Sequence, residues 1–456
     1  MGNLLTSLLD SSSALDVYGR EFSVIQNNIA NANTPGYVKQ DQSLVALPFN
    51  PSTGLAGGVG AGPLVSSRSE YLEQAIRNQQ QSLGSAQQKA GDLSQIQSLF
   101  DPTSTSGVPN ALDNLFGSFS QLSVNPNDGG ARQSVIDAAG QVAQAFNQVA
   151  TGIRSVGASL DNQTQDAVAT INQIAGQVAT INQTYRSDAQ AGQDAGLDAQ
   201  LHTALENLSQ VANYSLIKTA DGAYNVYLGG QTPLVIGAQP FAVSADFSGA
   251  QTVIRDAQGN DVTSQIDQGS LGALLQEKNV TLPGYTASLN AVAQNLADSV
   301  NTALSQGVDK NGNAPTVDLF TYDGNAGAAA TLGVSSITPG EIAAALPSAP
   351  GGNGNAIAIA QIGAQPVVNG TFTLTQAYGN LGGQVGQDLA NAKADQTSQQ
   401  NLLLQTQNQR AVQTKVSLDE EATKLLQFQQ AYQAVGKYIT VLETLTQTLL
   451  AIVPTG

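Results

Sequence analysis

Apolar residues near the start of the chain recur at the spacing of one helix face. Successive intervals in this row are 4, 7, 3, 4, 3 and 4 residues, which predicts a heptad-like helix. The row consists of Leu4, Leu8, Leu15, Tyr18, Phe22, Ile25 and Ile29. Pro35 and Gly36 follow, and a Pro-Gly pair fits the central positions of a type II turn. The first helix is therefore expected to end just before this turn.

A second row of the same kind lies at the other end of the chain. Ser417 and Glu420 precede it with the spacing of a capping box, in which each side chain bonds the backbone N–H group near the other. The row includes Leu425, Phe428, Tyr432, Ile439, Leu442 and Leu449. We predict that residues 1–33 and 418–452 pair as a coiled coil and form the assembly interface.

More helices are predicted between these ends. One runs from about residue 69 to residue 100, and a short one covers residues 112–122. A longer apolar row, with every interval 3 or 4, extends from Val135 to Tyr185 after a helix-capping Asp128. Glycines inside this row weaken a helix, so the pattern leaves open whether residues 135–185 form one continuous helix.

The periodicity changes after about residue 211. Short strand-like segments flank Asp221 and Gly222, a pair typical of a hairpin turn. The expected fold is mainly α and elongated, with paired terminal helices, a long-helix middle domain and an inserted, small, outer β-rich domain. The expected domains are residues 1–60 with 414–456, residues 61–210 with 283–413, and residues 211–282. This hairpin-like course of the chain would bring both termini to one end and place the insert at the opposite end.

Composition narrows the possible partners. Charged residues make up 11% of the 456 residues, the net charge is −17, and lysines and arginines form no stripe, so nucleic acid is not an expected partner. No apolar run is long enough for a membrane span. The start of the chain lacks the features of a secretory signal, so export would need another route.

The chain offers few residues for catalysis or metal binding. It has no cysteine, and its one histidine, His202, excludes an HExxH zinc site. A possible calcium loop at residues 309–320 has Phe320 where the last ligand should be a glutamate. Asp419, Glu420 and Glu421 are explained by their place at a helix start. We therefore predict no catalytic residue, no metal, no cofactor and no enzymatic activity.

Several segments carry a resemblance to known proteins. Residues 27–37, Asn-Asn-Ile-Ala-Asn-Ala-Asn-Thr-Pro-Gly-Tyr, resemble the N-terminal signature of flagellar rod, hook and hook-associated proteins. Residues 416–421, Val-Ser-Leu-Asp-Glu-Glu, with the Phe-Gln-Gln-Ala-Tyr segment at 428–432, resemble the end of the hook-associated FlgK family. The turn at residues 125–128 before the long helix is similar as well.

This resemblance implies a structural role outside the cell. It implies a subunit at the junction between hook and filament of the bacterial flagellum, needed for filament assembly and exported by the flagellar type III path. The implied partners are further copies of the chain in a ring, the hook protein, a second hook-associated protein and a FlgN-like export chaperone at the C-terminal helix. A hook or distal-rod subunit and a secreted coiled-coil adhesin remain as alternatives.

Overall fold

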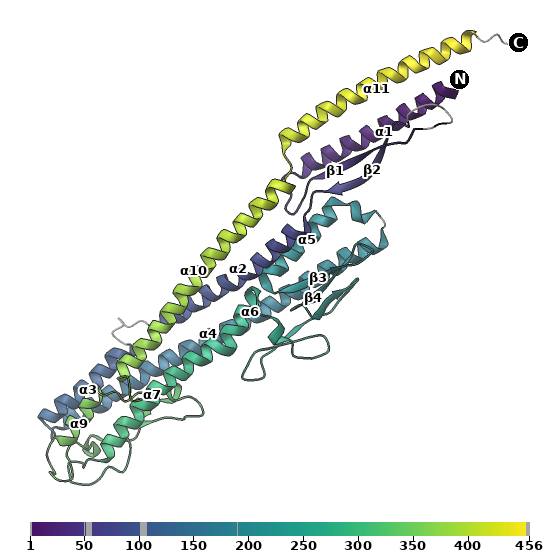
Figure 1. Ribbon diagram of the computed structural model, residues 1–456. Helices are drawn as coiled ribbons and strands as arrows, with labels where there is room; N and C mark the ends of the chain where they lie inside the picture. The colour runs from purple at the N-terminus through teal and green to yellow at the C-terminus, as the bar shows by residue number, and fades with distance from the viewer. Residues whose placement is uncertain (1, 50, 52–56, 101–106, 189, 453–456) are drawn as a thin grey trace.

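The molecule is a long helical rod with both chain ends at one end of it (Figure 1). A computed structural model describes residues 2–49, 51, 57–100, 107–188 and 190–452. The fold is mainly helical with small antiparallel sheets, as predicted. None of the helices in these ranges is both long and apolar enough to cross a membrane.

The terminal part consists of two helices and a hairpin. Helix α1 (Gly2–Asn31) runs antiparallel to α11 (Leu418–Ile452), as Figure 1 shows. Strands β1 (Gln40–Ala46) and β2 (Val59–Ser66) pair antiparallel and pack on α1. The glycines, prolines and serines of residues 50–63 are typical of a linker, but from Val59 onward backbone pairing with β1 makes this stretch a strand. Residues 50 and 52–56 lie outside the described ranges.

Long helices form the body of the rod. Helix α2 lies antiparallel against α10, and α3, α4 and α7 pack beside them (Figure 1). The body helices are α2 (Glu70–Gln97), α3 (Val108–Val124), α4 (Gly129–Ser187), α5 (Ala195–Val211), α6 (Gly269–Gln276), α7 (Leu282–Ser305) and α10 (Leu374–Thr414). Their apolar faces share one continuous core, whose members run from Ala90 to Ala392 and include no described residue of α1 or α11.

Helix α4 answers the question that the sequence left open. It is unbroken over 59 residues, which at 1.5 Å per residue makes it about 88 Å long. Asp128 caps its start, because the carboxylate accepts a hydrogen bond from the Gly130 backbone N–H at 2.8 Å. Val135, Phe146 and Ile171 are fully buried along its length. Packing against neighbouring helices thus outweighs the low helix propensity of its glycines.

The β-rich insert flanks α4 instead of forming the far tip. Strands β3 (Tyr214–Lys218), β4 (Tyr224–Leu228), β5 (Thr232–Ile236) and β6 (Gln239–Pro240) form one sheet, and β7 (Ser244–Asp246) pairs with β8 (Val253–Arg255). The predicted hairpin at Asp221 and Gly222 is present, with Gly222 at a φ of 86°. Asn182 of α4 holds the sheet, because it bonds the Tyr224 and Gly237 carbonyls. The expectation that the insert lies opposite the termini was therefore wrong (Figure 1).

Short elements and loops occupy the end opposite the termini, beside α3 (Figure 1). They include β9 (Phe320–Thr321), α8 (Ala328–Thr331), β10 (Gly333–Val334) and α9 (Gly354–Ile362). Single turns of 3-10 helix occur at Ser98–Phe100, Ala191–Gln193, Thr263–Gln265 and Pro339–Glu341. Arg132 at the start of α4 fastens this region, because it donates to the carbonyl oxygens of Pro339 and Ile342.

A π-helical segment, Glu277–Thr281, joins α6 to α7. Pro283, two residues after its end, has no backbone N–H to donate, which favours a local widening of the helix. Glu277 is fully buried, and burial raises the pKa of its carboxyl to about 7, an effect that Lys89 partly opposes. Burial also raises the pKa of Asp92 on α2 to about 6.

These two carboxyls should make the body less stable as the pH rises. Their pKa values in the folded state lie above the ordinary values of 4.5 for Glu and 3.8 for Asp, so the folded protein binds more protons between about pH 4 and pH 7 and loses that stabilisation above this range. We expect Glu277→Gln to stabilise the protein by about 1–3 kcal/mol at pH 8 and by much less at pH 4.5. Urea denaturation at both pH values measures this, with exposed Glu443→Gln as the control. Equal gains at both pH values would contradict it.

Candidate assembly interface

Helices α1 and α11 meet along a row that mixes apolar and polar residues. Val17, Glu21, Ile25 and Asn28 are the buried positions of α1 in its lower half, at intervals of 4, 4 and 3. Two aromatic pairs connect the helices, Tyr18 with Phe428 and Phe22 with Tyr432, each with ring centroids 5.9 Å apart. Such pairs contribute about 0.5–1.5 kcal/mol each beyond the area that they bury.

The predicted interface residues divide into three groups. Ile25 and Leu442 are buried, and Leu4, Leu8, Leu15, Tyr18, Phe22, Phe428 and Ile439 are half-buried. Ile29, Leu425, Tyr432 and Leu449 are exposed. Spacing alone missed Val17, Glu21 and Asn28, because two of these three buried residues are polar and interrupt the apolar row.

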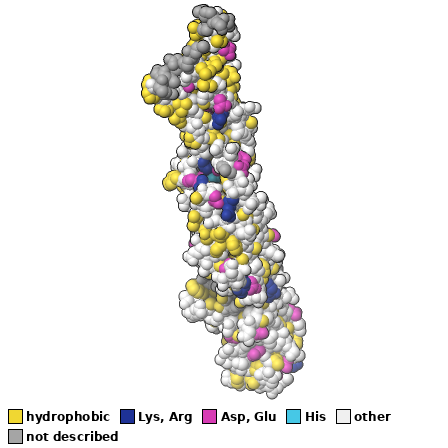
Figure 2. All heavy atoms as spheres, turned by 90° about the vertical axis from the view of Figure 1, so that its right-hand side faces the viewer, with side chains coloured by type: hydrophobic (Ala, Val, Ile, Leu, Met, Phe, Trp, Pro, Cys, Tyr) yellow, Lys and Arg dark blue, Asp and Glu magenta, His cyan; other side chains and the backbone are white. Residues whose placement is uncertain are grey.

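Most of the apolar surface of α11 faces solvent. Among its described side chains only Glu421 and Leu442 are buried. Six further apolar side chains are each between 41% and 59% exposed: Leu418, Leu426, Val441, Leu445, Leu449 and Leu450. The β1–β2 hairpin adds exposed Leu44, Val45, Leu47, Phe49 and Val65. Figure 2 shows hydrophobic side chains gathered over this upper end of the molecule. Exposed apolar surface on this scale marks an interaction site.

A buried polar network fixes the base of the helix pair. The side-chain amide of Asn28 donates to the Gln40 carbonyl at 2.8 Å and to the Glu421 carboxylate at 3.1 Å. Its carbonyl oxygen accepts from the Tyr37 hydroxyl at 2.8 Å and from the Gln40 backbone N–H at 3.1 Å. Burial, followed by the Glu421 charge, raises the pKa of Tyr37 to about 12. One side chain of the N-terminal signature therefore joins α1, β1 and α11.

The Pro-Gly turn has the predicted geometry. The Tyr37 N–H bonds the Thr34 carbonyl at 3.1 Å, and Gly36 has a φ of 75°. A side chain at Gly36 would also collide with α5, because an added Cβ would lie 2.5 Å from the Thr203 hydroxyl oxygen and 2.7 Å from the Ala199 carbonyl oxygen. Pro35 is exposed at the outside of the turn. The turn thus docks the terminal part on the body.

The cap of α11 is only half of the predicted box. The Ser417 hydroxyl accepts from the Glu420 backbone N–H at 3.4 Å, as expected. The Glu420 carboxylate does not return to Ser417, because it forms an ion pair with Lys39 at 2.8 Å. A full charge attracts the carboxylate more strongly than a backbone N–H does. Lys424 and Asp41 form a second pair between α11 and the hairpin at 2.5 Å.

Below the turn, a buried carboxylate connects three parts of the chain. Glu73 of α2 is 0% exposed and pairs with Arg68 at 2.8 Å and with Arg410 of α10 at 3.0 Å. Arg68 also pairs with Asp198 of α5 at 2.7 Å and donates to the Gly36 carbonyl at 2.7 Å. Arg410 reaches Glu206 of α5 as well. This cluster links α2, α5, α10 and the Pro-Gly turn.

His202 is buried beside this cluster. Its Nε2 atom lies 3.5 Å from an Asp198 oxygen. Burial, with the nearby Arg68, Arg77, Lys218 and Arg410 charges, lowers the pKa of His202 well below its usual value. It is therefore neutral near pH 7. In the described ranges, no three His, Asp or Glu side chains stand where they could hold a metal.

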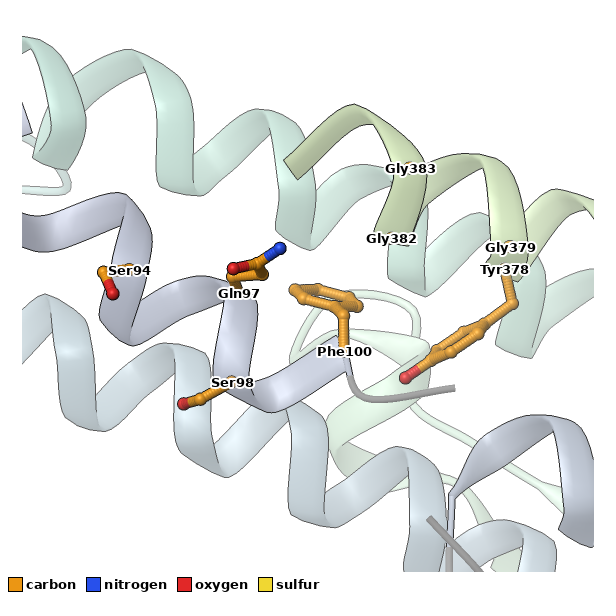
Figure 3. A pocket seen from close by; sticks show the side chains of 8 residues that line it. All are labelled: Ser94, Gln97, Ser98, Phe100, Tyr378, Gly379, Gly382 and Gly383. Atoms are coloured by element: carbon orange, nitrogen blue, oxygen red, sulfur yellow. The ribbon is translucent and has the colours of Figure 1, made fainter. Parts of the chain in front are cut away.

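A cavity of about 680 Å³ lies between α2 and α10 (Figure 3). Its lining residues are Ser94, Gln97, Ser98, Phe100, Tyr378, Gly379, Gly382 and Gly383. The Phe100 and Tyr378 rings lie 5.9 Å apart, and burial raises the pKa of Tyr378 to about 12. These lining residues carry no group that changes charge near neutral pH.

Comparison with known proteins agrees with this architecture. Residues 11–37 match the flagella basal body rod protein family, and residues 407–452 match the C-terminal region of the flagellar basal body rod FlgEFG proteins. Residues 93–320, half of the chain, match the helical domain of the flagellar hook-associated protein FlgK. The matches of the two terminal segments thus define a structural protein of the bacterial flagellum. The match of residues 93–320 identifies one family among these proteins, and the chain belongs to the flagellar hook-associated protein FlgK family.

Individual relatives support this assignment. Flagellar hook-associated protein 1 of Bacillus subtilis is 26% identical over 99% of this chain and 98% of its own length. The Salmonella typhimurium protein of that name is 25% identical over 68% of this chain and 58% of its own length. The flagellar hook junction protein FlgK of Burkholderia pseudomallei superposes over 76% of this chain and all of that chain, with a TM-score of 0.67 and 18% identity. The chain is a hook–filament junction protein of the extracellular flagellum and not an enzyme.

Proposed function

We propose that copies of this chain form a ring between hook and filament, held together by the apolar surface of the terminal helices. The observation that carries this proposal is the exposure of the apolar side chains along α11, which the chain itself leaves uncovered. In this proposal residues 1–60 with 414–456 form the assembling domain, and residues 61–210 with 283–413 form a helical body. The insert at residues 211–282 stands beside that body.

The same surface would serve two further partners in turn. A FlgN-like chaperone would cover the exposed face of α11 before export by the type III path, since an apolar helix face of this kind invites aggregation. After assembly, a second hook-associated protein would contact the ring on its filament side. The family assignment and the exposed apolar face of α11 support the proposal of these two partners.

A deletion in the source bacterium tests the junction role. We expect cells that lack the gene to carry hooks without filaments and to release flagellin into the medium, because the filament has no base on which to grow. Electron microscopy of the cells shows whether hooks carry filaments, and an immunoblot of the medium detects the released flagellin. Cells without hooks would point to a hook or rod subunit, and cells with normal flagella would contradict the proposal.

The terminal helices should be dynamic before assembly. They lie outside the continuous core of the body, so their opening costs few apolar contacts. We expect fast hydrogen exchange over residues 2–31 and 418–452 in the free subunit, slow exchange over α4, and slow exchange of all three segments in assembled flagella. Helix α4 serves as the internal control. Strong protection of both termini in the free subunit would contradict this expectation.

A further inference from the structure

A second cavity, of about 590 Å³, lies between α2 and the β-rich insert. Two cations, Arg77 and Lys218, line it, together with one carboxylate, Glu70. The rest of the lining consists of three tyrosines, three side-chain amides, a serine and a leucine: Tyr71, Tyr214, Tyr224, Gln74, Asn78, Gln81, Ser215 and Leu216. The Glu70 carboxylate accepts a hydrogen bond from the Tyr224 hydroxyl at 3.0 Å, and the Lys218 ammonium lies 5.2 Å from the centre of the Tyr224 ring.

Arg77 is a buried cation without a counter-ion. It is only 8% exposed, and its Nη1 atom is buried without a hydrogen-bond partner. Glu73, one helical turn earlier, is its natural partner on α2, but both Glu73 oxygens are taken by Arg68 and Arg410. Among the described residues, no Asp or Glu carboxylate forms an ion pair with Arg77.

Arg132, another buried arginine, differs from Arg77 because its guanidinium is hydrogen-bonded. Arg132 is 3% exposed, and its guanidinium donates to the carbonyl oxygens of Pro126, Pro339 and Ile342. A buried guanidinium without such partners is costly, because it has lost its hydration without gaining hydrogen bonds. An anion placed in the cavity that Arg77 lines would give the guanidinium the charge partner that it lacks.

The charges favour a carboxylate as that anion. Arg77, Lys218 and Glu70 together carry one net positive charge, which a single negative charge neutralises. The planar guanidinium matches a carboxylate with two parallel hydrogen bonds. The chain itself has 34 acidic residues against 17 basic ones, so neighbouring copies in an assembly present many carboxylates. Tyr71 at the edge of the cavity is 79% exposed, and tyrosine and arginine are typical of the centres of protein interfaces.

We propose that this cavity is a contact site between subunits, in which Arg77 and Lys218 bind an Asp or Glu side chain of a second copy of the chain. The proposal rests on the assembly of copies proposed above. It adds a polar, orienting contact on the body to the apolar contacts of the terminal helices.

Stability of the free subunit gives the first test. Arg77→Gln removes an unpaired buried charge, so we expect its thermal midpoint to equal or exceed that of the wild type. Arg154→Gln is the matched control, because Arg154 is exposed on α4 and the change of charge is the same. A fall of several degrees for Arg77→Gln would overturn the proposal, since it would show that the chain itself satisfies this guanidinium.

Cross-linking in assembled flagella gives the second test. Tyr71 is replaced by the photoreactive p-benzoylphenylalanine, and cross-linked peptides are identified by mass spectrometry. We expect a peptide of a second copy that contains Asp or Glu, with a yield that falls about tenfold or more in the Arg77→Gln background and is unchanged in Arg154→Gln. Absence of a copy-to-copy product, or a yield indifferent to Arg77→Gln, would overturn the proposal.

The two proposals can fail separately. Suppose that the deletion abolishes filaments as expected but that no copy-to-copy product forms at Tyr71. This result would refute the contact and leave the junction role intact, because the deletion experiment measures filament growth alone. Free glutamate is a further probe. If it raises the thermal midpoint of the wild type but not of Arg77→Gln, and no cross-link forms, the cavity takes a free carboxylate and the contact between subunits is refuted.

Discussion

Gly36→Ala is expected to detach the terminal helix pair from the body of the rod. The new Cβ would lie 2.5 Å from the Thr203 hydroxyl and 2.7 Å from the Ala199 carbonyl, and the φ of 75° disfavours any residue with a side chain. We expect a loss of about 3 kcal/mol or more at this contact. Hydrogen exchange of the free subunit should rise over residues 37–47 and at the start of α5, and filament formation should fail.

Gly230→Ala is the matched control for this change. Gly230 has a φ of 81°, but nothing lies within 4 Å of an added Cβ. Gly230→Ala should therefore lower the free energy of unfolding only by the cost of the left-handed conformation, about 1–2 kcal/mol. Filaments should still form. Equal effects of the two substitutions would show that backbone conformation, and not the contact with α5, is why position 36 requires glycine.

Glu73→Gln should cause a comparable loss of stability by a different mechanism. The fully buried carboxylate neutralises Arg68 and Arg410, so a neutral amide leaves two guanidinium groups with less compensation. Breaking a buried ion pair by removing one partner costs about 3–5 kcal/mol. Urea denaturation of the free subunit measures this as a lower midpoint with an unchanged slope.

The control for Glu73 is Glu420→Gln. The Glu420 side chain is exposed, and its partner Lys39, although mostly buried, also has the Glu421 carboxylate at 3.8 Å, so loss of this pair should cost only about 0–1 kcal/mol. Its denaturation midpoint should lie close to that of the wild type. A loss below about 1 kcal/mol for Glu73→Gln would mean that water replaces the carboxylate and that the cluster is not essential to the joint.

Local patterns predicted the helices and the turn because each depends on neighbours in the sequence. The 3.6-residue periodicity indicated α1, α4 and α11, and the Pro35-Gly36 pair indicated the turn. The spacing could not show that Asn28 contacts Glu421, because 393 positions separate them and neither side chain is apolar. It also could not show that Lys39 would attract the Glu420 carboxylate away from the cap.

The position of the β-rich insert along the rod could not be predicted from the sequence for a similar reason. Chain order puts this insert between helices, but its position along the rod depends on side-chain contacts such as Asn182 with the Tyr224 and Gly237 carbonyls. Cavities lined by several elements, and the buried Arg77 within one of them, likewise depend on distant segments meeting. Sequence periodicity reports which face of an element is buried and not which partner covers it.

The unbroken helix α4 also has a mechanical meaning. A junction must pass force from one part of the flagellum to the next. In α4 the backbone hydrogen bonds run nearly parallel to the axis for about 88 Å, so axial load is shared by the bonds of every turn. Neighbouring helices packed along it resist buckling. Helix α4 can therefore act as a strut, and compliance would be concentrated at the short break between Thr414 and Leu418, where α10 gives way to α11.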